Sequence, residues 1–114
     1  MEINDQEYNI RYDADTATLH FQGTLRLIGV HAYASIATLL EKVADIGPPL
    51  ITVNVRELNS LNSSGVTTLA KFVIKVSKIE HIQMTIQGSQ KISWQKKSLT
   101  NLTRLMPRLQ LEWE

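Results

Sequence analysis

The sequence predicts a single-domain α/β fold, in which a mixed β-sheet carries its helices mainly on one face. Four short segments alternate apolar and polar residues, as strands with one buried face do, and three longer segments repeat apolar residues at helical spacing. A run rich in β-branched residues, Leu50–Val55, is typical of a central strand. The chain of 114 residues is long enough for one core, so residues 1–114 form one predicted domain.

The first two predicted strands form a hairpin. Tyr8–Tyr12 alternates, and Thr16–Gln22 places Ala17, Leu19 and Phe21 on one face. Asp13 and Asp15, between the two strands, favour a tight turn. This turn preference explains the two acids more simply than a functional pair of carboxylates does. Gly23 breaks the pattern, and the residues from 24 to 29 are expected to be an extended connector.

The first predicted helix covers residues 30–46, where apolar residues repeat at helical spacing. Gly47-Pro48-Pro49 ends it, because proline cannot continue a helix and glycine suits the C-terminal cap. The central strand Leu50–Val55 follows, and residues 56–61 are predicted to be a loop.

The second half of the chain alternates helix and strand. Helices are predicted for residues 64–79 and 90–106, and strands for residues 82–87 and 109–113. The complete predicted order is β-β-α-β-α-β-α-β. Strands that alternate with helices imply right-handed crossovers and a mostly parallel sheet, to which the opening hairpin adds an antiparallel part.

Asn62-Ser63-Ser64-Gly65 is the most informative segment for function. It gathers two hydroxyls and an amide where the predicted helix 64–79 begins. Free backbone N–H groups and the positive end of the helix dipole favour a phosphate at such a place. Taken alone, serine and asparagine before a helix most often serve as caps, so a plain cap is the competing interpretation of Ser63.

The sequence shows few features of other functional classes. Without cysteine there is no disulfide, thiolate chemistry or zinc-finger site, and the three histidines are too far apart in sequence for a metal-ligand motif. A net charge of +1 argues against a dedicated nucleic-acid binder. No phosphate-binding loop, dinucleotide fingerprint or nucleophile elbow is present, so we expect no enzyme activity and no cofactor. No apolar run approaches membrane-spanning length and no signal peptide precedes the domain, so we expect a cytoplasmic protein.

Charge is unevenly distributed along the chain. Basic residues dominate from residue 71 to residue 108, and they are Lys71, Lys75, Lys78, Lys91, Lys96, Lys97, Arg104 and Arg108. They are either solvated helix faces or a docking face for an acidic partner, because such fields steer association. Trp94 lies within this region and either packs against the sheet or anchors a partner.

The segment from Leu50 to Val66 resembles the signature of the STAS domain, a family that includes the bacterial anti-sigma-factor antagonists. The shared pattern is an apolar strand, a short loop, an aspartate-serine-serine-glycine motif and a helix. The predicted order of elements matches the family along nearly the whole chain, and Gly23-Thr24-Leu25 is similar to the family's glycine-acid-leucine stretch.

The resemblance implies a regulatory binding module without catalysis. In such antagonists the first serine of the motif is phosphorylated by a partner serine kinase that is also the anti-sigma factor, and a metal-dependent serine phosphatase reverses the modification. The unphosphorylated form binds the partner. By position the phosphoacceptor is Ser63, with Ser64 as second choice. The predicted partner-binding residues are Arg26, Asn62, Ser63, Ser64, Gly65, Val66, Lys71 and Lys75.

Two residues depart from the family pattern. Asn62 replaces the usual aspartate, which keeps the capping ability but removes a charge. Arg26 occupies a place where the family commonly has an acid, and it could pair with a phosphate on Ser63 if its loop lies near the helix start. The alternatives are a STAS-type adaptor that is not phosphorylated, or an accessory subunit of another signalling or transport system. An enzyme that uses Ser63 as nucleophile ranks last.

Overall fold

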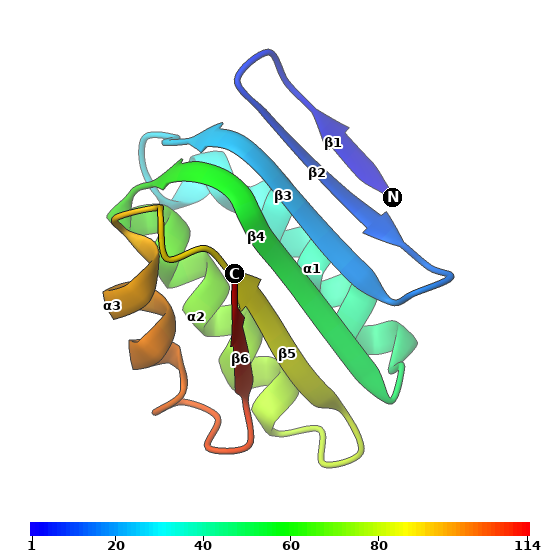
Figure 1. The fold of residues 1–114 in the computed structure, drawn as a ribbon. Coiled ribbons are helices and arrows are strands. Elements are labelled where there is room, and N and C mark those ends of the chain that lie inside the picture. Colours follow the sequence, from blue (N-terminus) through cyan, green and yellow to red (C-terminus); the bar gives the residue numbers. More distant parts are fainter.

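One six-stranded sheet organises the protein in the computed structural model, which describes residues 1–114. The strands lie side by side in the order in which they occur in the sequence, from β1 to β6 (Figure 1). The elements are β1 (Glu2–Asn4), β2 (Tyr8–Asp13), β3 (Thr18–Leu25), the 3-10 turn η1 (Val30–Tyr33), α1 (Ala34–Ile46), β4 (Leu50–Leu61), α2 (Ser63–Ser77), β5 (Gln83–Gly88), α3 (Gln95–Leu102) and β6 (Gln110–Trp113).

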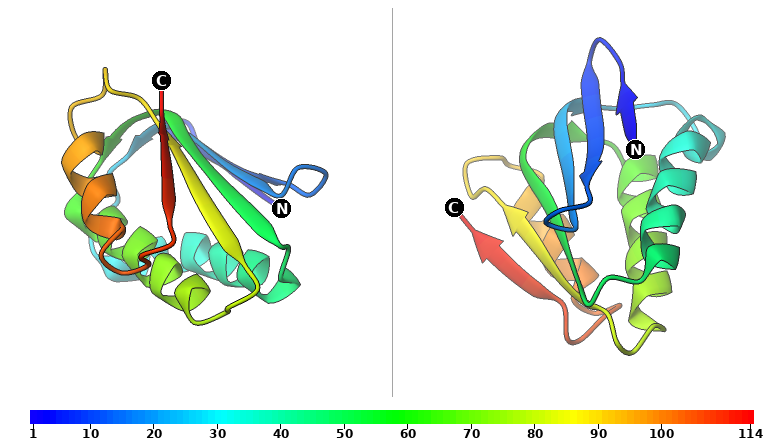
Figure 2. Two further views of the ribbon diagram at one scale, coloured as in Figure 1. Left: turned by 60° about the horizontal axis from the view of Figure 1, so that its bottom comes forward. Right: turned by 90° about the vertical axis from the view of Figure 1, so that its right-hand side faces the viewer.

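The sheet is mixed, as predicted. β1, β2 and β3 pair antiparallel, whereas β3, β4, β5 and β6 pair parallel. The three α-helices lie on one face of the sheet and leave the other face open (Figure 2). In β4 the side chains of Ile51, Val53 and Val55 are buried, and those of Thr52 and Asn54 between them are partly exposed. This alternation confirms the predicted helix-covered face.

The observed elements differ from the predicted ones at five places. The short strand β1 was not predicted, and β3 continues through Gly23 to Leu25. The first helical segment begins with the 3-10 turn η1 before it becomes α1, and the third shrinks to α3. The predicted loop 56–61 is wrong, because these residues form the second half of β4.

Irregular pairing explains why the second half of β4 was predicted to be a loop. His20 pairs with Asn54 but Gln22 pairs with Glu57, so β4 carries an extra residue here, and the register shifts again after Gly23. Each extra residue reverses which side chains face the core, which removes the simple alternation that marks a strand. The irregular strand bends visibly at this end (Figure 1).

α3 holds the bent part of β4 in place. Trp94 Nε1 donates a hydrogen bond of 2.9 Å to the carbonyl oxygen of Leu58. Gln95 Nε2 donates to Val55 O at 2.6 Å and to Leu58 O at 3.2 Å, and the Gln95 side chain is completely buried. These bonds satisfy backbone groups that the irregular ladder leaves available. The bend carries the chain from the sheet to the start of α2.

None of the helices combines the length and the apolar character that crossing a bilayer requires.

Candidate functional site at the start of helix α2

Asn62 connects three parts of the chain at the beginning of α2. Its Oδ1 accepts a hydrogen bond of 3.0 Å from the backbone N–H of Gly65, which makes Asn62 the N-cap of the helix. The same oxygen accepts the Tyr33 hydroxyl at 2.6 Å, and Asn62 Nδ2 donates to the carbonyl oxygen of Leu27 at 2.7 Å. Asn62 therefore links α2 both to η1 and to the loop that follows β3.

The donor on Asn62 gives a physical reason for asparagine where the family pattern has aspartate. A carboxylate accepts hydrogen bonds but cannot donate one. An aspartate would still cap Gly65 and accept the Tyr33 hydroxyl, but it would place an oxygen against the Leu27 carbonyl oxygen. In this chain the amide side chain fits the loop, and the charge that the family usually has beside the serine is absent.

The buried side chain of Tyr33 supports the hydrogen bonds around Asn62. Its side chain is 1% exposed, and its hydroxyl lies 3.2 Å from Leu25 O and accepts the Leu27 N–H at 3.3 Å. Burial raises the pKa of the Tyr33 phenol above its ordinary value of 10.0, and the hydrogen bond from Leu27 opposes that shift in part. The sequence placed Tyr33 on the apolar stripe of a helix, and its hydrogen bond to Asn62 was not predicted.

Gly65 lets α2 approach its neighbours closely. A Cβ at this position would overlap the Leu61 side chain and lie 2.9 Å from the Tyr33 hydroxyl oxygen. Close packing therefore favours glycine at this position. The predicted role of Gly65 in shaping the helix start has this steric basis, while its contact with a partner stays a prediction.

Ser63 is the first residue of α2, and its side chain is exposed. Its hydroxyl makes no hydrogen bond within the protein, because Asn62 supplies the cap. The competing interpretation of Ser63 as a plain cap is thus wrong. Ser64 is half-buried, and its carbonyl oxygen accepts the Thr68 hydroxyl at 2.9 Å. The backbone N–H groups of Ser63 and Ser64 lie in the first turn, where a helix offers no internal acceptor.

Arg26 lies in the loop that Asn62 holds, so the loop after β3 is indeed near the helix start. Its guanidinium is exposed and donates from Nη1 to the Ser60 hydroxyl at 3.0 Å. The positive charge of Arg26 also opposes, in part, the rise in the pKa of Tyr33 that burial causes. Val66 is half-buried and packs against the core, so only part of it is available to a partner.

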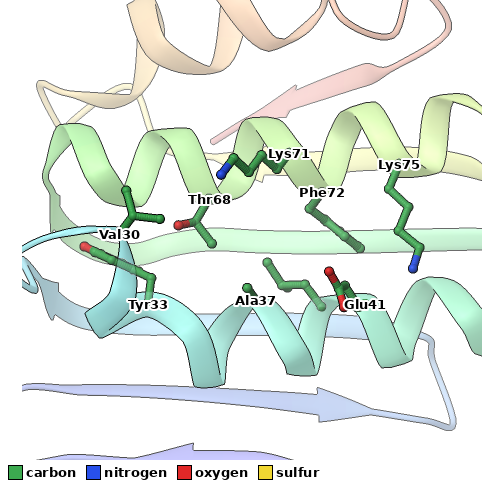
Figure 3. Close-up of a pocket in the computed structure, with 9 residues that line it drawn as sticks. Val30, Tyr33, Ala37, Glu41, Thr68, Lys71, Phe72 and Lys75 are labelled. Atoms are coloured by element: carbon green, nitrogen blue, oxygen red, sulfur yellow. The ribbon is translucent and has the colours of Figure 1, made fainter.

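Lys71 and Lys75 lie further along α2, beside a hollow of about 140 Å³ between η1, α1 and α2. Figure 3 shows side chains from the two walls pointing toward one another. Nine residues line this α1–α2 groove: Val30, Tyr33, Ala37, Leu40, Glu41, Thr68, Lys71, Phe72 and Lys75. Lys75 Nζ forms an ion pair with Asp45 at 3.1 Å, whereas Lys71 is exposed and forms none. The groove was not predicted, because its α1 wall is distant in sequence from the motif.

Not all of the basic residues after residue 71 belong to a docking face. Arg108 donates to the carbonyl oxygens of Val76, Ser77, Ile79 and Ile82 at 2.9–3.3 Å, and so caps the end of α2. Trp94 is half-buried, packs against the core and donates its indole N–H to the Leu58 carbonyl oxygen, which confirms the predicted packing. The lysines of α3, in contrast, are exposed.

The protein contains no group of three histidine, cysteine, aspartate or glutamate residues placed to hold a metal ion. No histidine or carboxylate side chain forms a hydrogen bond to Ser63.

No protein-family model and no curated protein sequence matches this chain. Two solved structures are similar in fold. One is the crystal structure of the diguanylate cyclase SiaD in complex with its activator SiaC from Pseudomonas aeruginosa, with 11% identity, a TM-score of 0.75, and coverage of 100% of this chain and 99% of the matched chain. The other is SiaC of Pseudomonas aeruginosa, with 10% identity, a TM-score of 0.74, and coverage of 100% and 98%. The likeness confirms the predicted α/β fold along the whole chain, while membership of the STAS family stays a prediction.

Proposed function

We propose that this protein is a non-catalytic regulatory adaptor that binds a signalling protein through the start of α2 and is switched by phosphorylation of Ser63. The observation that carries the proposal is the exposed Ser63 hydroxyl, which contributes no hydrogen bond to the fold. A phosphate at this place breaks no contact that the folded state needs. The proposed partner-binding surface comprises the residues around Ser63, together with Arg26 and Lys71.

The surroundings of Ser63 favour a phosphate group. A phosphoserine adds about −1.5 to −2 charges and three acceptor oxygens. At a helix N-terminus a negative charge gains roughly 0.3–1 kcal/mol from the dipole. Arg26 donates to the Ser60 hydroxyl, and we propose that it exchanges this bond for a charge-assisted bond to the phosphate. The fold is therefore retained after phosphorylation, while a bound partner would face a new charge.

SiaC, similar in fold, is described as the activator of a diguanylate cyclase. This favours an adaptor of a signalling system other than an anti-sigma factor, which was the alternative interpretation of the sequence. The partner that we propose is accordingly a signalling enzyme. A serine kinase and a metal-dependent serine phosphatase that set the state of Ser63 belong to the proposal as separate proteins.

Purification of the tagged full-length chain from its native cells tests the proposal. We expect one signalling protein to copurify with the wild type and with Ser63→Ala. In Ser63→Asp we expect its recovery to fall at least roughly tenfold, about 1.4 kcal/mol, because the complex would have to remove the new carboxylate from water. Thr100→Asp adds the same charge on the exposed face of α3 and is the matched control.

Equal recovery of the partner with all four proteins would overturn the switch and leave an adaptor that is not phosphorylated. Recovery that falls equally in Thr100→Asp would show a general effect of charge, and it would also contradict the assigned site.

A further inference from the structure

Two large apolar side chains are exposed where the chain enters η1: Ile28 in the preceding loop and Val30, the first residue of η1. Ile28 is 93% exposed, and Val30, which also lines the groove, is 51% exposed. Asn62 Nδ2 donates to the Leu27 carbonyl oxygen at 2.7 Å, which ties the residue before Ile28 to the start of α2. Exposed apolar side chains at the edge of an apolar groove are typical of a protein-binding site.

We propose that the α1–α2 groove binds an amphipathic helix of the partner protein, with Ile28 and Val30 at one end of the contact. The inference rests on the proposed function, and it names the kind of segment that the partner contributes. The groove extends from Val30 to Glu41 along one wall, which corresponds to roughly 16 Å, or about three turns of helix.

The chemistry of the groove favours a helix over an extended segment. Both walls are helical, so their backbone N–H and C=O groups are already paired within η1, α1 and α2. An extended segment on this surface would bury its own backbone groups without partners, at a cost that a helix avoids by pairing them internally. The apolar floor formed by Ala37, Leu40 and Phe72 suits an apolar stripe at helical spacing.

The charges on the two rims define which side of the bound helix faces α1 and which side faces α2. Lys71 on the α2 rim and Glu41 on the α1 rim are both exposed, and neither forms an ion pair within the protein. Lys75 is already paired with Asp45 at the far end. A complementary helix therefore carries a carboxylate on the side that faces α2 and a basic residue on the side that faces α1.

Photo-crosslinking in the native cells tests this assignment with the full-length chain. A benzophenone amino acid replaces Glu41 in the groove rim, Thr67 on the exposed face near Ser63, or Thr100 on α3 as control. We expect an adduct from Glu41 that maps to a partner segment with apolar residues three and four positions apart and an acidic residue beside them. We expect none from Thr100.

The three positions separate the two proposals. A partner adduct from Thr67 without one from Glu41 would overturn the groove assignment and leave the adaptor function standing. No adduct from either position would overturn both. A Glu41 adduct on a lipid, on a second copy of this chain, or on an extended segment would also overturn the bound helix.

A binding measurement with the mapped segment as a synthetic peptide completes the test. Ala37→Arg fills the groove, and we expect it to weaken binding at least roughly tenfold, whereas Lys71→Glu should weaken it less and mainly at low salt. Ser35→Arg adds the same side chain at an exposed position on α1 outside the groove and should bind like the wild type. Unchanged binding in Ala37→Arg would refute the proposal.

Discussion

Asn62→Asp tests whether the amide at the helix cap is required by the loop that it holds. The substitution keeps an acceptor for the Gly65 N–H and the Tyr33 hydroxyl, but it removes the donor that lies 2.7 Å from the Leu27 carbonyl oxygen. Leaving one partly buried polar group unpaired costs about 1–3 kcal/mol. A carboxylate at the N-terminus of α2 recovers about 0.3–1 kcal/mol. The expected net loss of unfolding free energy is about 1–2 kcal/mol.

Urea unfolding followed by tryptophan fluorescence measures this loss. With a denaturant slope of about 2 kcal/mol per molar, the urea midpoint should fall by roughly 0.5–1 M. The urea midpoint of Asn62→Ala, which also removes the cap, should fall further, and it gives the size of the loss when all Asn62 hydrogen bonds are absent. A midpoint for Asn62→Asp equal to or above that of the wild type would refute the role assigned to the Leu27 contact.

Three further predictions concern the packing that supports the site. Gly65→Ala should lower the unfolding free energy by about 1–3 kcal/mol despite its better helix propensity, because the new Cβ meets Leu61 and the Tyr33 hydroxyl; a higher melting temperature would contradict this. Gln95→Leu should lower the unfolding free energy by about 2–4 kcal/mol in urea unfolding, since it removes the buried hydrogen bonds of Gln95 to the Val55 carbonyl oxygen and the Ser89 N–H, and a wild-type midpoint would refute it. The raised pKa of Tyr33 means that the neutral phenol stabilises the fold at pH values below about 10 and that this contribution is lost as pH rises further. Tyr33→Phe should therefore lose less stability than the wild type between pH 9 and about 11, and an identical alkaline loss would contradict the prediction.

The fold could be predicted from the sequence wherever apolar residues recur at the regular spacing of a strand or a helix. Leu50–Val55 and the striped segments each mark one element, and their alternation defines the mixed sheet. The second half of β4 could not be predicted, because its extra residues cancel the alternation of buried and exposed side chains. Two of its supporting residues, Trp94 and Gln95, also lie about 40 residues later in the sequence.

The candidate site could be predicted only where its residues are neighbours in the sequence. Ser63 and Asn62 lie within one short motif, so the sequence alone indicates their place at the helix start. The division of roles between them depends on Tyr33 and Leu27, which reach Asn62 from other elements. Apolar spacing marks Tyr33 as a core residue and carries no sign of the bond made by its hydroxyl.

The most direct test of the central claim is phosphopeptide mass spectrometry of the protein isolated from its native cells, with Ser63→Ala in parallel. We expect phosphate on Ser63, at a level that changes between growth, stress and starvation, and no signal from that residue in the variant. A peptide that covers Ser63 and stays unmodified under all three conditions, or that carries phosphate only on Ser64, would contradict it.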